Sequence, residues 1–571
     1  MNSILSLSND YNHLKYTDRK IFVIDKVFNP DDNHIFKKVE LINNDIKDKE
    51  HLINGYKRCD TIYKNILKDL SEELNRIHKI KKEKTSWEII IGKWLLEFVY
   101  ICHKNFLLCE KALNEKNFNS IIMADPNSYS LHVNDTDDFP WATQDSAWNL
   151  CLNSKIIEFL KTDKKKEYVK TKHNSFLRKK NYRQTNYLKK KILNFLNKFL
   201  KFNKIIVVYS TSFKLFQEKK IELLLSQIPR FWPKERLKIK VFDKKLREQI
   251  SLNNQSSDKL ENFIRSILPE SIPLFVIESF ESIRKQMLMM NFPSNPSKVF
   301  TCYGYAYDEI FKYYLSEIKE KKIPIYIGQH GNNYFTSIAQ KYLSELNYSD
   351  KFISWGSKSE KNILQGFNFN TFGKIKKNNS KGKLLIVCEA VGCDYSPFER
   401  NLFNQKNAKS VVRLVNNLVP KRNYLELKLH HTHYEKFNGY YYKKYFKNLN
   451  VKKVCNENYF KLVKNSRLVF FNYDSTGLLE NLSLNIPTVC FWENTFFHLN
   501  EKYIQKYKKL IDANILFENF EKLINHIDIN WNNIEGWWYS SKTQKIINEF
   551  NKDLNINNQK YEYLTNLLKN E

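Results

Sequence analysis

The sequence predicts an α/β protein with two Rossmann-like domains that face each other across a cleft and an N-terminal helical addition. Short apolar runs alternate with helical segments twice along the chain, and this alternation is typical of parallel sheets. A polar stretch from Lys374 to Lys383 separates the two series and has the composition of a linker. The length of 571 residues, with 42% hydrophobic and 15% aromatic residues, allows large cores and excludes a disordered chain.

The expected boundaries follow from these changes in pattern. Residues 1–200 would hold a strand, a helical block and a basic segment, all packed on the first Rossmann-like domain. That domain would span residues 201–373, the linker residues 374–383 and the second Rossmann-like domain residues 384–535. Residues 536–571 would form a C-terminal helix that returns to the first domain.

Apolar runs mark the expected strands, and apolar residues at helical spacing between Ile46 and Lys116 mark the helical block. The N-terminal strand candidates are Lys20–Asp25 and Ser120–Ala124. The first series comprises Ile205–Tyr209, Leu274–Ile277, Val299–Tyr303, Ile323–Ile327 and Phe352–Trp355. The second series comprises Leu384–Val387, Tyr424–Leu429, Val451–Val454, Leu468–Phe471 and Thr488–Phe491.

The formal net charge of +31 suggests an anionic partner, yet only 14 of the 93 basic residues are arginine. Specific readers of nucleic acid favour arginine for its bidentate fork. We therefore interpret most of the excess as lysine on solvated faces and expect no specific nucleic-acid partner. The segment from Lys161 to Lys201 interleaves lysine with Tyr and Phe, so a surface for nucleic acid or lipid head groups remains the alternative there.

Cysteine usage and targeting signals favour a cytoplasmic protein. The nine cysteines include no CxxC pair, which indicates buried free thiols and neither a disulfide framework nor a zinc site. Residues Met1 to Asp25 lack the pattern of a signal peptide. The longest apolar run, Trp87 to Cys102, contains three charged residues, so we expect no membrane span.

The first candidate site is the run from Ile323 to Phe335, where an apolar strand ends in Gly328, Gln329, His330, Gly331 and Asn332. Ligands bind at the carboxyl ends of strands in open parallel sheets. His330 would act as a general base or contact the acceptor, because a histidine pKa lies near working pH. A histidine that only stabilises the turn is the structural alternative.

The second candidate site is the run from Tyr424 to Phe437, where another strand ends in Lys428, His430, His431 and His433. Such a cluster could hold a phosphate, or its histidines could be structural or exposed. No carboxylate or cysteine lies at a spacing that supports zinc, so we expect no metal.

The third and most specific candidate lies between Phe470 and Trp492, where Ser475, Thr476 and Gly477 follow a strand and start a helix. Hydroxyls and free backbone N–H groups at a helix start form an anion site. Glu480 follows Thr476 by four residues and shares its helix face, where it could accept both hydroxyls of a ribose. An ordinary capped helix with Glu480 exposed is the alternative.

These motifs resemble those of a bacterial family of transferases connected with surface-carbohydrate biosynthesis. The resemblance extends over most of the chain, and it implies a GT-B-like architecture of two Rossmann-like domains. The segments that carry it are WEIIIGKWLLEFVY (Trp87 to Tyr100), STSFKLFQEKKIELLLSQIPRFWP (Ser210 to Pro233), IGQHGNNY, DKFISWG (Asp350 to Gly356) and STGLLENLSLNIPT (Ser475 to Thr488).

A wider similarity is to GT-B enzymes that use CMP-activated acidic sugars, such as sialyl- and Kdo transferases. Their His-Pro pair would correspond to His430 and His431, with histidine in place of proline, and their Ser/Thr pair to Ser475 and Thr476. Because histidine replaces this proline, a sugar donor linked to uridine or thymidine diphosphate remains an alternative to the CMP-linked donor. The turn at His330 also resembles one in CDP-glycerol polyol-phosphate transferases, which share the general fold.

We therefore predict a metal-independent, cofactor-free glycosyltransferase of a surface glycan, with a glycan or lipid-linked acceptor and a position at the inner membrane face. Ser475, Thr476 and Gly477 would hold phosphate, Glu480 the ribose, and Lys428 and His430 the phosphate or leaving group. The alternatives are a CDP-polyol phosphotransferase, a basic nucleic-acid-binding protein and a non-catalytic scaffold.

Overall fold

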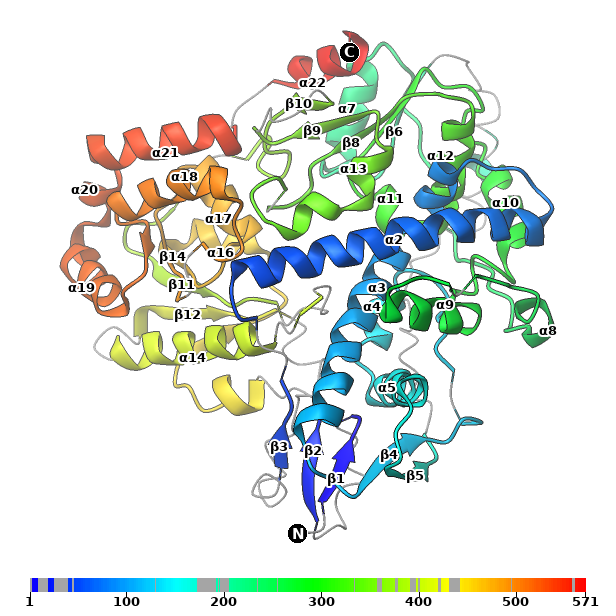
Figure 1. Cartoon of the computed structure of the whole chain (residues 1–571). Coiled ribbons are helices and arrows are strands. Elements are labelled where there is room, and N and C mark those ends of the chain that lie inside the picture. The colour runs from blue at the N-terminus through cyan, green and yellow to red at the C-terminus, as the bar shows by residue number, and fades with distance from the viewer. Residues whose placement is uncertain are drawn as a thin grey trace.

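All paired strands of the described residues run parallel and form three sheets, one in the N-terminal region and one in each Rossmann-like domain (Figure 1). The predicted α/β class with two Rossmann-like domains is confirmed. The computed structural model describes residues 3–8, 19–24, 39–43, 46–128, 130–171, 191–193, 195, 205–233, 235–253, 255–332, 334–356, 362–374, 378–390, 397–398, 401–418, 423–430, 442–493, 496–556 and 560–570. Most of the basic segment and both His431 and His433 lie outside them.

The N-terminal region has a sheet of its own, in the order β3-β2-β1-β4-β5, where the sequence patterns predict only β2 and β4. Strands β1 and β3 contain only two apolar residues each and so do not show as apolar runs, and β5 lies within the lysine-rich segment. The elements are β1 (Ser3–Ser6), β2 (Lys20–Val23), β3 (Val39–Leu41), α2 (Lys49–His78), α3 (Lys84–Glu115), β4 (Ser120–Ala124), α4 (Phe139–Ala142), α5 (Ser146–Leu160) and β5 (Lys165–Val169).

The first Rossmann-like domain is built on a sheet in the order β10-β9-β8-β7-β6, which places β8 at its centre. Its strands are β6 (Ile206–Val208), β7 (Lys298–Thr301), β8 (Ile325–Gly328), β9 (Lys351–Ser354) and β10 (Ile363–Gln365). Its helices are α7 (Leu215–Leu224), α8 (Lys244–Arg247), α9 (Lys259–Ser271), α10 (Phe280–Met289), α11 (Gly304–Tyr307), α12 (Glu309–Glu320), the 3-10 helix η2 (Ala339–Tyr342) and α13 (Ser344–Tyr348).

One expected strand of this domain is wrong. The run Leu274–Ile277 forms a turn after α9, in which the Val276 N–H donates to the Pro273 carbonyl at 3.0 Å. All four residues of the run are buried. An apolar run therefore marks burial here, and the proline before it starts a turn in place of a strand.

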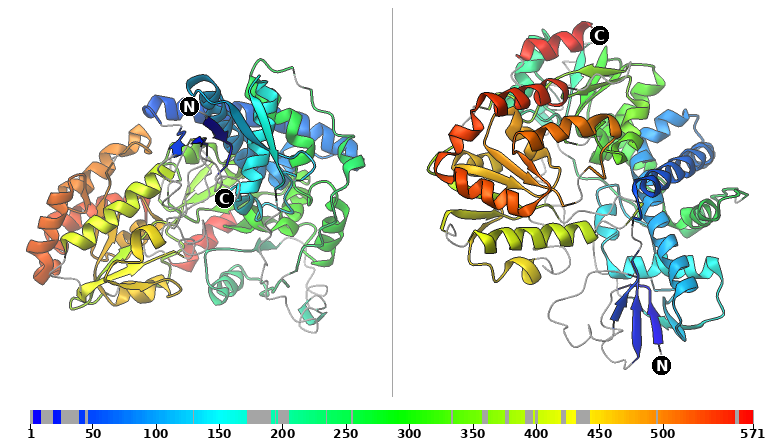
Figure 2. Two further views of the ribbon diagram at one scale, coloured as in Figure 1. Left: turned by 90° about the horizontal axis from the view of Figure 1, so that it is seen from below. Right: turned by 60° about the vertical axis from the view of Figure 1, so that its left-hand side comes forward.

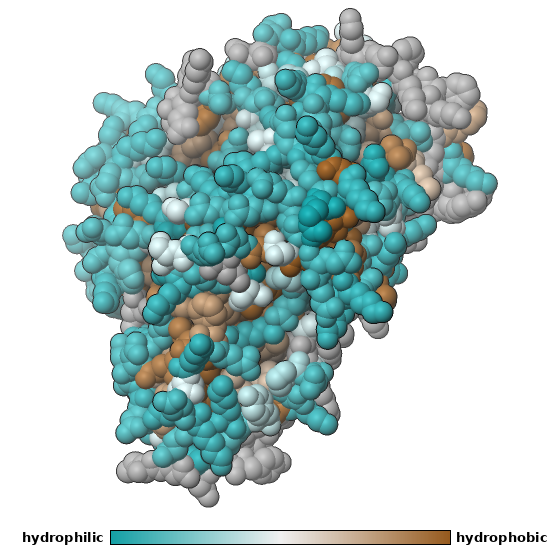
Figure 3. Space-filling model, turned by 45° about the vertical axis from the view of Figure 1, so that its right-hand side comes forward, coloured by the Kyte–Doolittle hydropathy of each residue, from teal (hydrophilic) through white to brown (hydrophobic). Residues whose placement is uncertain are grey.

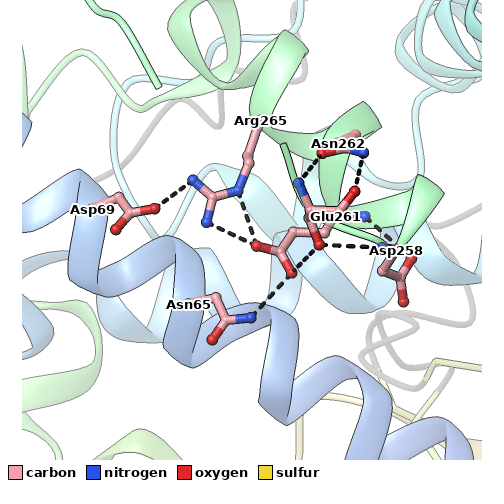
Figure 4. A network of polar contacts seen from close by, with 7 residues as sticks. Asn65, Asp69, Asp258, Glu261, Asn262 and Arg265 are labelled. Atoms are coloured by element: carbon pink, nitrogen blue, oxygen red, sulfur yellow. Dashed lines mark hydrogen bonds and ion pairs between the residues drawn. The ribbon is translucent and has the colours of Figure 1, made fainter. Parts of the chain in front are cut away.

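Helix α2 crosses the middle of the molecule and ties the N-terminal region to the first Rossmann-like domain through charged side chains (Figure 1). Arg58 of α2 forms two hydrogen bonds of 2.8 Å with Asp258, which caps α9. Farther along, Arg265 of α9 lies between Asp69 of α2 and Glu261 of its own helix (Figure 4). These pairs fix the register between α2 and α9.

A buried ion pair on α12 makes a second connection to the N-terminal region. Lys312 and Glu309 lie one turn apart at 3.0 Å, and their side chains are 0% and 1% exposed. Glu309 accepts from the Thr136 backbone N–H at 3.0 Å, and Lys312 donates to the Thr136 hydroxyl at 2.8 Å. The loop before α4 is thus held on α12 by a pair of charges out of contact with water.

The second Rossmann-like domain has the strand order β13-β12-β11-β14-β15-β16. This is the 3-2-1-4-5-6 order of dinucleotide-binding sheets. Successive strands are added toward one edge of the sheet up to β13 and toward the other edge from β14 onward, so the order of addition changes between β11 and β14. The strands are β11 (Lys383–Val387), β12 (Leu425–Lys428), β13 (Lys452–Val454), β14 (Ser466–Phe471), β15 (Thr488–Phe491) and β16 (Leu516–Phe517). The helices are α14 (Asn401–Asn417), the π-helix η5 (Tyr442–Phe446), α16 (Tyr459–Lys464), α17 (Thr476–Ser483), α18 (Glu501–Asp512), α19 (Phe520–Asn530) and the 3-10 helix η6 (Trp531–Asn533).

The C-terminal segment forms the short α20 (Ile534–Trp538) and two longer helices, α21 (Ser541–Leu554) and α22 (Tyr561–Asn570), where one was expected. Helix α21 packs on α17 and α18, whereas α22 lies on α7 of the first domain (Figure 2). Between them, the Ile556 N–H donates to the Trp355 carbonyl at 2.7 Å. One hydrophobic cluster accordingly contains residues of both Rossmann-like domains and of α21 and α22.

The surface is mainly hydrophilic on the face drawn in Figure 3, with apolar residues in small groups. Within the described ranges, no helix has both the length and the apolar character needed to cross a bilayer. The eight cysteines that the structure describes are free, and seven of them are buried.

Candidate active site

The start of α17 lies at the carboxyl end of β14, beside the reversal of strand order in the second domain. Ser475 is the N-cap, and its hydroxyl accepts from the Leu478 N–H at 3.0 Å. A Cβ on Gly477 would lie 2.9 Å from the Phe471 ring and 3.1 Å from the Tyr459 hydroxyl. Glycine at position 477 therefore serves the close packing of α17 on β14.

The turn after β8 is held by its own glutamine. The Gln329 side chain donates to the Gly331 carbonyl at 2.8 Å and accepts from the Trp355 N–H at 2.8 Å. A Cβ on Gly328 would lie 2.7 Å from the Cys302 sulfur, so the strand end requires glycine. The buried Gln329 is thus a support of the turn, and His330 and Gly331 are the partly exposed residues of this segment.

The β8 turn and the start of α17 are in direct contact across the two domains. The Asn332 N–H donates to the Thr476 hydroxyl at 3.0 Å, and a Cβ on Gly331 would lie 3.4 Å from that same oxygen. The Asn332 amide donates to Asp474 at 2.6 Å and to the Ser475 carbonyl at 3.3 Å. Two of the three motifs singled out in the sequence therefore meet at one place.

Glu480 lies next to this contact and is buried, which excludes the alternative of an exposed residue on a capped helix. Its carboxylate accepts from the Asn370 amide at 2.9 Å, and the same amide lies 3.4 Å from the His330 carbonyl. Burial raises the pKa of Glu480 to about 7, although the charge of Lys374 and the bond from Asn370 favour the carboxylate.

Lys374 completes the charged part of the site. Its ammonium donates to the Asn370 carbonyl and lies 3.2 Å from the centre of the Phe460 ring on α16. Burial lowers the pKa of Lys374 to about 8, against the attraction of Glu480. Neither Asn370 nor Lys374 stands out in the sequence. Asn370 precedes the polar linker and Lys374 begins it, in a chain rich in lysine and asparagine.

His330 is surrounded by tyrosines. Its Nδ1 lies 3.4 Å from the Tyr305 hydroxyl and 3.3 Å from the Tyr334 hydroxyl, and both hydroxyls donate to the buried Glu345. The Tyr303 hydroxyl donates to the His330 carbonyl at 3.3 Å. Burial lowers the pKa of His330 to about 4, so the imidazole is neutral at pH 7. Tyr334 lies in the IGQHGNNY segment, whereas Tyr303, Tyr305 and Glu345 belong to no motif that the sequence shows.

The second motif lies two strands away from α17. Adjacent parallel strands are ~4.8 Å apart, so the ends of β12 and β14 are separated by about 10 Å. The Lys428 ammonium donates to the Leu429 carbonyl at 3.2 Å and to the Cys455 carbonyl. His430 is half-buried at the end of β12. The sheet thus places Lys428 and His430 on the edge that carries Thr476, without direct contact.

Within the described ranges, no three side chains of His, Cys, Asp or Glu are arranged to hold a metal ion. The expected metal independence stays a prediction.

A family model matches residues 8–568, which is nearly the whole chain. The chain belongs to the LIC12162 family of transferases. Its membership agrees with the family resemblance that the motifs indicate, while the wider similarity to CMP-sugar enzymes stays a prediction.

Three solved structures show a distant likeness to this LIC12162-family chain. MurG of Acinetobacter baumannii is 10% identical over 65% of this chain and 100% of its own, with a TM-score of 0.34. The spinosyn rhamnosyltransferase SpnG is 11% identical over 51% of this chain and 77% of its own, with a TM-score of 0.30. SpnG complexed with thymidine diphosphate is 10% identical over 51% and 78%, with a TM-score of 0.29. No curated protein is significantly similar in sequence.

Proposed function

We propose that the protein is a GT-B glycosyltransferase whose second Rossmann-like domain binds a nucleotide sugar and whose first domain presents the acceptor. One observation carries the proposal. The turn that holds His330 touches the start of α17, and Glu480 lies beside the same turn. A neutral histidine, a helix start and a buried carboxylate therefore meet at the edge of the sheet where such folds bind ligands.

The donor would lie across the carboxyl ends of β12, β11 and β14. Ser475, Thr476 and the N–H groups of α17 would hold phosphate, since a helix start favours negative charge. Glu480 would accept the ribose hydroxyls. Lys374, Lys428 and His430 would offset the charge of the leaving group, which is the stabilisation that drives such a transfer.

The acceptor hydroxyl would lose its proton to His330 as the sugar is transferred. A neutral imidazole can take up this proton, and burial keeps His330 neutral at pH 7. The lowered pKa, below the value near working pH that the sequence led us to expect, also makes His330 a weaker base, so the imidazolium must be stabilised as the proton is transferred. The hydroxyl oxygen forms the bond to the anomeric carbon, and the nucleotide departs with the bonding electrons.

For the donor we favour a CMP-linked acidic sugar, with uridine or thymidine diphosphate sugars as the other choices. The acceptor would be a glycan or lipid-linked intermediate of a bacterial surface polysaccharide. The net charge of +31 suits work beside an anionic membrane at the cytoplasmic face. These finer assignments rest on the sequence resemblance.

Thermal unfolding in the presence of CMP, CDP, UDP, dTDP and GDP tests the donor directly. A ligand that binds only the folded state at 100 times its Kd stabilises it by about 2.7 kcal/mol. We expect one nucleotide to raise the Tm of the wild-type protein and to leave that of Glu480→Gln nearly unchanged.

The matched control is Glu426→Gln, because Glu426 is a buried carboxylate of the same domain that pairs with Lys452 on the neighbouring strand. That variant should keep the nucleotide-dependent shift. Absence of a shift with every nucleotide would contradict the proposal, and a product extended by a polyol phosphate would identify the CDP-polyol phosphotransferase instead.

The affinity for the nucleotide should also depend on pH. With a pKa of about 7, Glu480 is mostly protonated at pH 6, and a protonated carboxyl cannot accept both ribose hydroxyls. Because apparent affinity scales with the competent fraction, we expect it to rise roughly five- to tenfold from pH 6 to pH 7.5, where Lys374 is still largely charged. Calorimetric titration at both pH values measures this change. An equal rise in Glu480→Gln would show that Glu480 is not its cause.

A further inference from the structure

A buried hydrogen-bonded cluster lies behind His330. Tyr305 comes from α11, Tyr334 follows the β8 turn, and Glu345 lies in the first turn of α13. The Glu345 carboxylate accepts from the Tyr305 hydroxyl at 3.0 Å and from the Tyr334 hydroxyl at 2.8 Å. The two hydroxyl oxygens are 3.2 Å apart, and all three side chains are 5% exposed or less.

The number of protons in this cluster determines how His330 is protonated. A carboxylate accepts hydrogen bonds and donates none, whereas each tyrosine has one proton to donate. With both hydroxyl protons directed at Glu345, the tyrosine oxygens present only lone pairs to Nδ1 of His330, at 3.4 and 3.3 Å. The favourable partner for two lone pairs is an N–H, so the single proton of the neutral imidazole belongs on Nδ1.

The opposite nitrogen is then the basic one. The described residues offer no hydrogen-bond partner to Nε2 of His330, while the carbonyl of the same residue faces Tyr303 and Asn370. The rings of Tyr303 and Tyr334 lie 4.9 and 5.5 Å from the imidazole and restrict its rotation. Packing therefore holds the ring, and the cluster sets its tautomer.

We propose that Glu345, acting through Tyr305 and Tyr334, is the positioning residue that keeps the His330 proton on Nδ1 and leaves Nε2 as the base for the acceptor hydroxyl. The proposal rests on the transferase function proposed above. When Nε2 takes up the acceptor proton, the imidazolium bears a positive charge. Glu345 then stabilises it through the two hydroxyls, and the nearby Lys93, itself paired with Glu97, opposes it.

The Glu345→Gln substitution tests this directly, because an amide can donate as well as accept. One tyrosine proton can then turn toward Nδ1 and move the imidazole proton to Nε2. Nitrogen-15 NMR of histidine-labelled protein, with His330 assigned from a His330→Gln sample, should show Nδ1–H in the wild type and a shift toward Nε2–H in Glu345→Gln. We expect kcat to fall roughly 10- to 100-fold, a part of what general-base catalysis contributes.

The matched control is Glu88→Gln. Glu88 is also buried and accepts a tyrosine proton, from Tyr63 at 2.9 Å, yet it has no contact with His330. This variant should keep the His330 tautomer and kcat. Nucleotide-induced thermal shifts should be unchanged in both variants, which separates an effect on the base from an effect on donor binding.

Tyrosine variants keep the test decisive if Glu345→Gln fails to fold. Tyr305→Phe and Tyr334→Phe should each lower kcat only a few-fold, because the remaining hydroxyl still joins Nδ1 to Glu345. The double variant should match Glu345→Gln in kcat and in tautomer. An unchanged Nδ1–H signal in the double variant would overturn the proposal. A wild-type protein with the Nδ1–H tautomer but no transferase activity would overturn the proposed function and retain the assigned tautomer.

Discussion

Replacing His330 with glutamine is expected to lower kcat by roughly 10²- to 10⁴-fold, the range that general-base catalysis contributes. Glutamine retains a polar side chain of similar length but has no nitrogen basic enough to take the acceptor proton. Because burial lowers the pKa of His330 to about 4, the wild-type kcat should show no loss between pH 7 and pH 5 from protonation of this base. Steady-state rates with a saturating nucleotide sugar measure both effects.

His526→Gln provides the matched control. Burial also lowers the pKa of His526 to about 4, and this histidine lies on α19 beside Trp537, remote from the β8 turn. The control should keep kcat, and both variants should keep the nucleotide-induced thermal shift. A His330→Gln enzyme with kcat within threefold of the wild type would show that His330 only supports the turn.

Replacing Lys312 with methionine is expected to destabilise the protein by about 3–5 kcal/mol, which is the usual cost of removing one partner of a buried ion pair. Methionine fills a similar volume but leaves Glu309 without its cation in a site where both side chains are at most 1% exposed. Thr136 would also lose its bond from the ammonium. Urea unfolding monitored by tryptophan fluorescence measures the loss.

The control for this variant lies on the same helix. Lys319 pairs with Asp350 at 2.9 Å, but the Asp350 side chain is 41% exposed, so Lys319→Met should cost at most about 1 kcal/mol. Burial raises the pKa of Glu309 in the folded protein. The free energy of unfolding therefore falls as the pH rises through that pKa, because the folded state must then hold a buried charge. The deficit of Lys312→Met should therefore be larger at pH 8 than at pH 5, and a deficit that is equal at both pH values would contradict this origin.

The sequence predicts most strands of the two Rossmann-like domains because apolar residues dominate them and show as apolar runs. Nine of the ten strand candidates in the two series match observed strands within a few residues, whereas Leu274–Ile277 is a buried turn. Three strands of the N-terminal sheet are not predicted, because β1 and β3 contain only two apolar residues each and β5 is charged. Hydrophobic periodicity reports burial first and conformation second, so it fails where a turn is buried or a strand is polar.

The candidate site also has residues that the sequence predicts and contacts that it does not show. Ser475, Thr476, His330 and Asn332 carry recognisable local signals, since a capped helix and a glycine-flanked turn after a strand have patterns of their own. The sequence does not show that Asn332 donates to Thr476, 144 positions away.

By itself, the sequence determined the fold class, the strand ends that carry polar residues and the family. These depend on interactions within short segments, which leave a period or a motif in the chain. Only the tertiary structure decided that Glu480 is buried beside Lys374 and Asn370, and that Glu345 reaches His330 through two tyrosines. Those contacts join residues that are distant in sequence or lack any motif. The shifted pKa values of Glu480 and Lys374 come from exclusion of water, which no local pattern records.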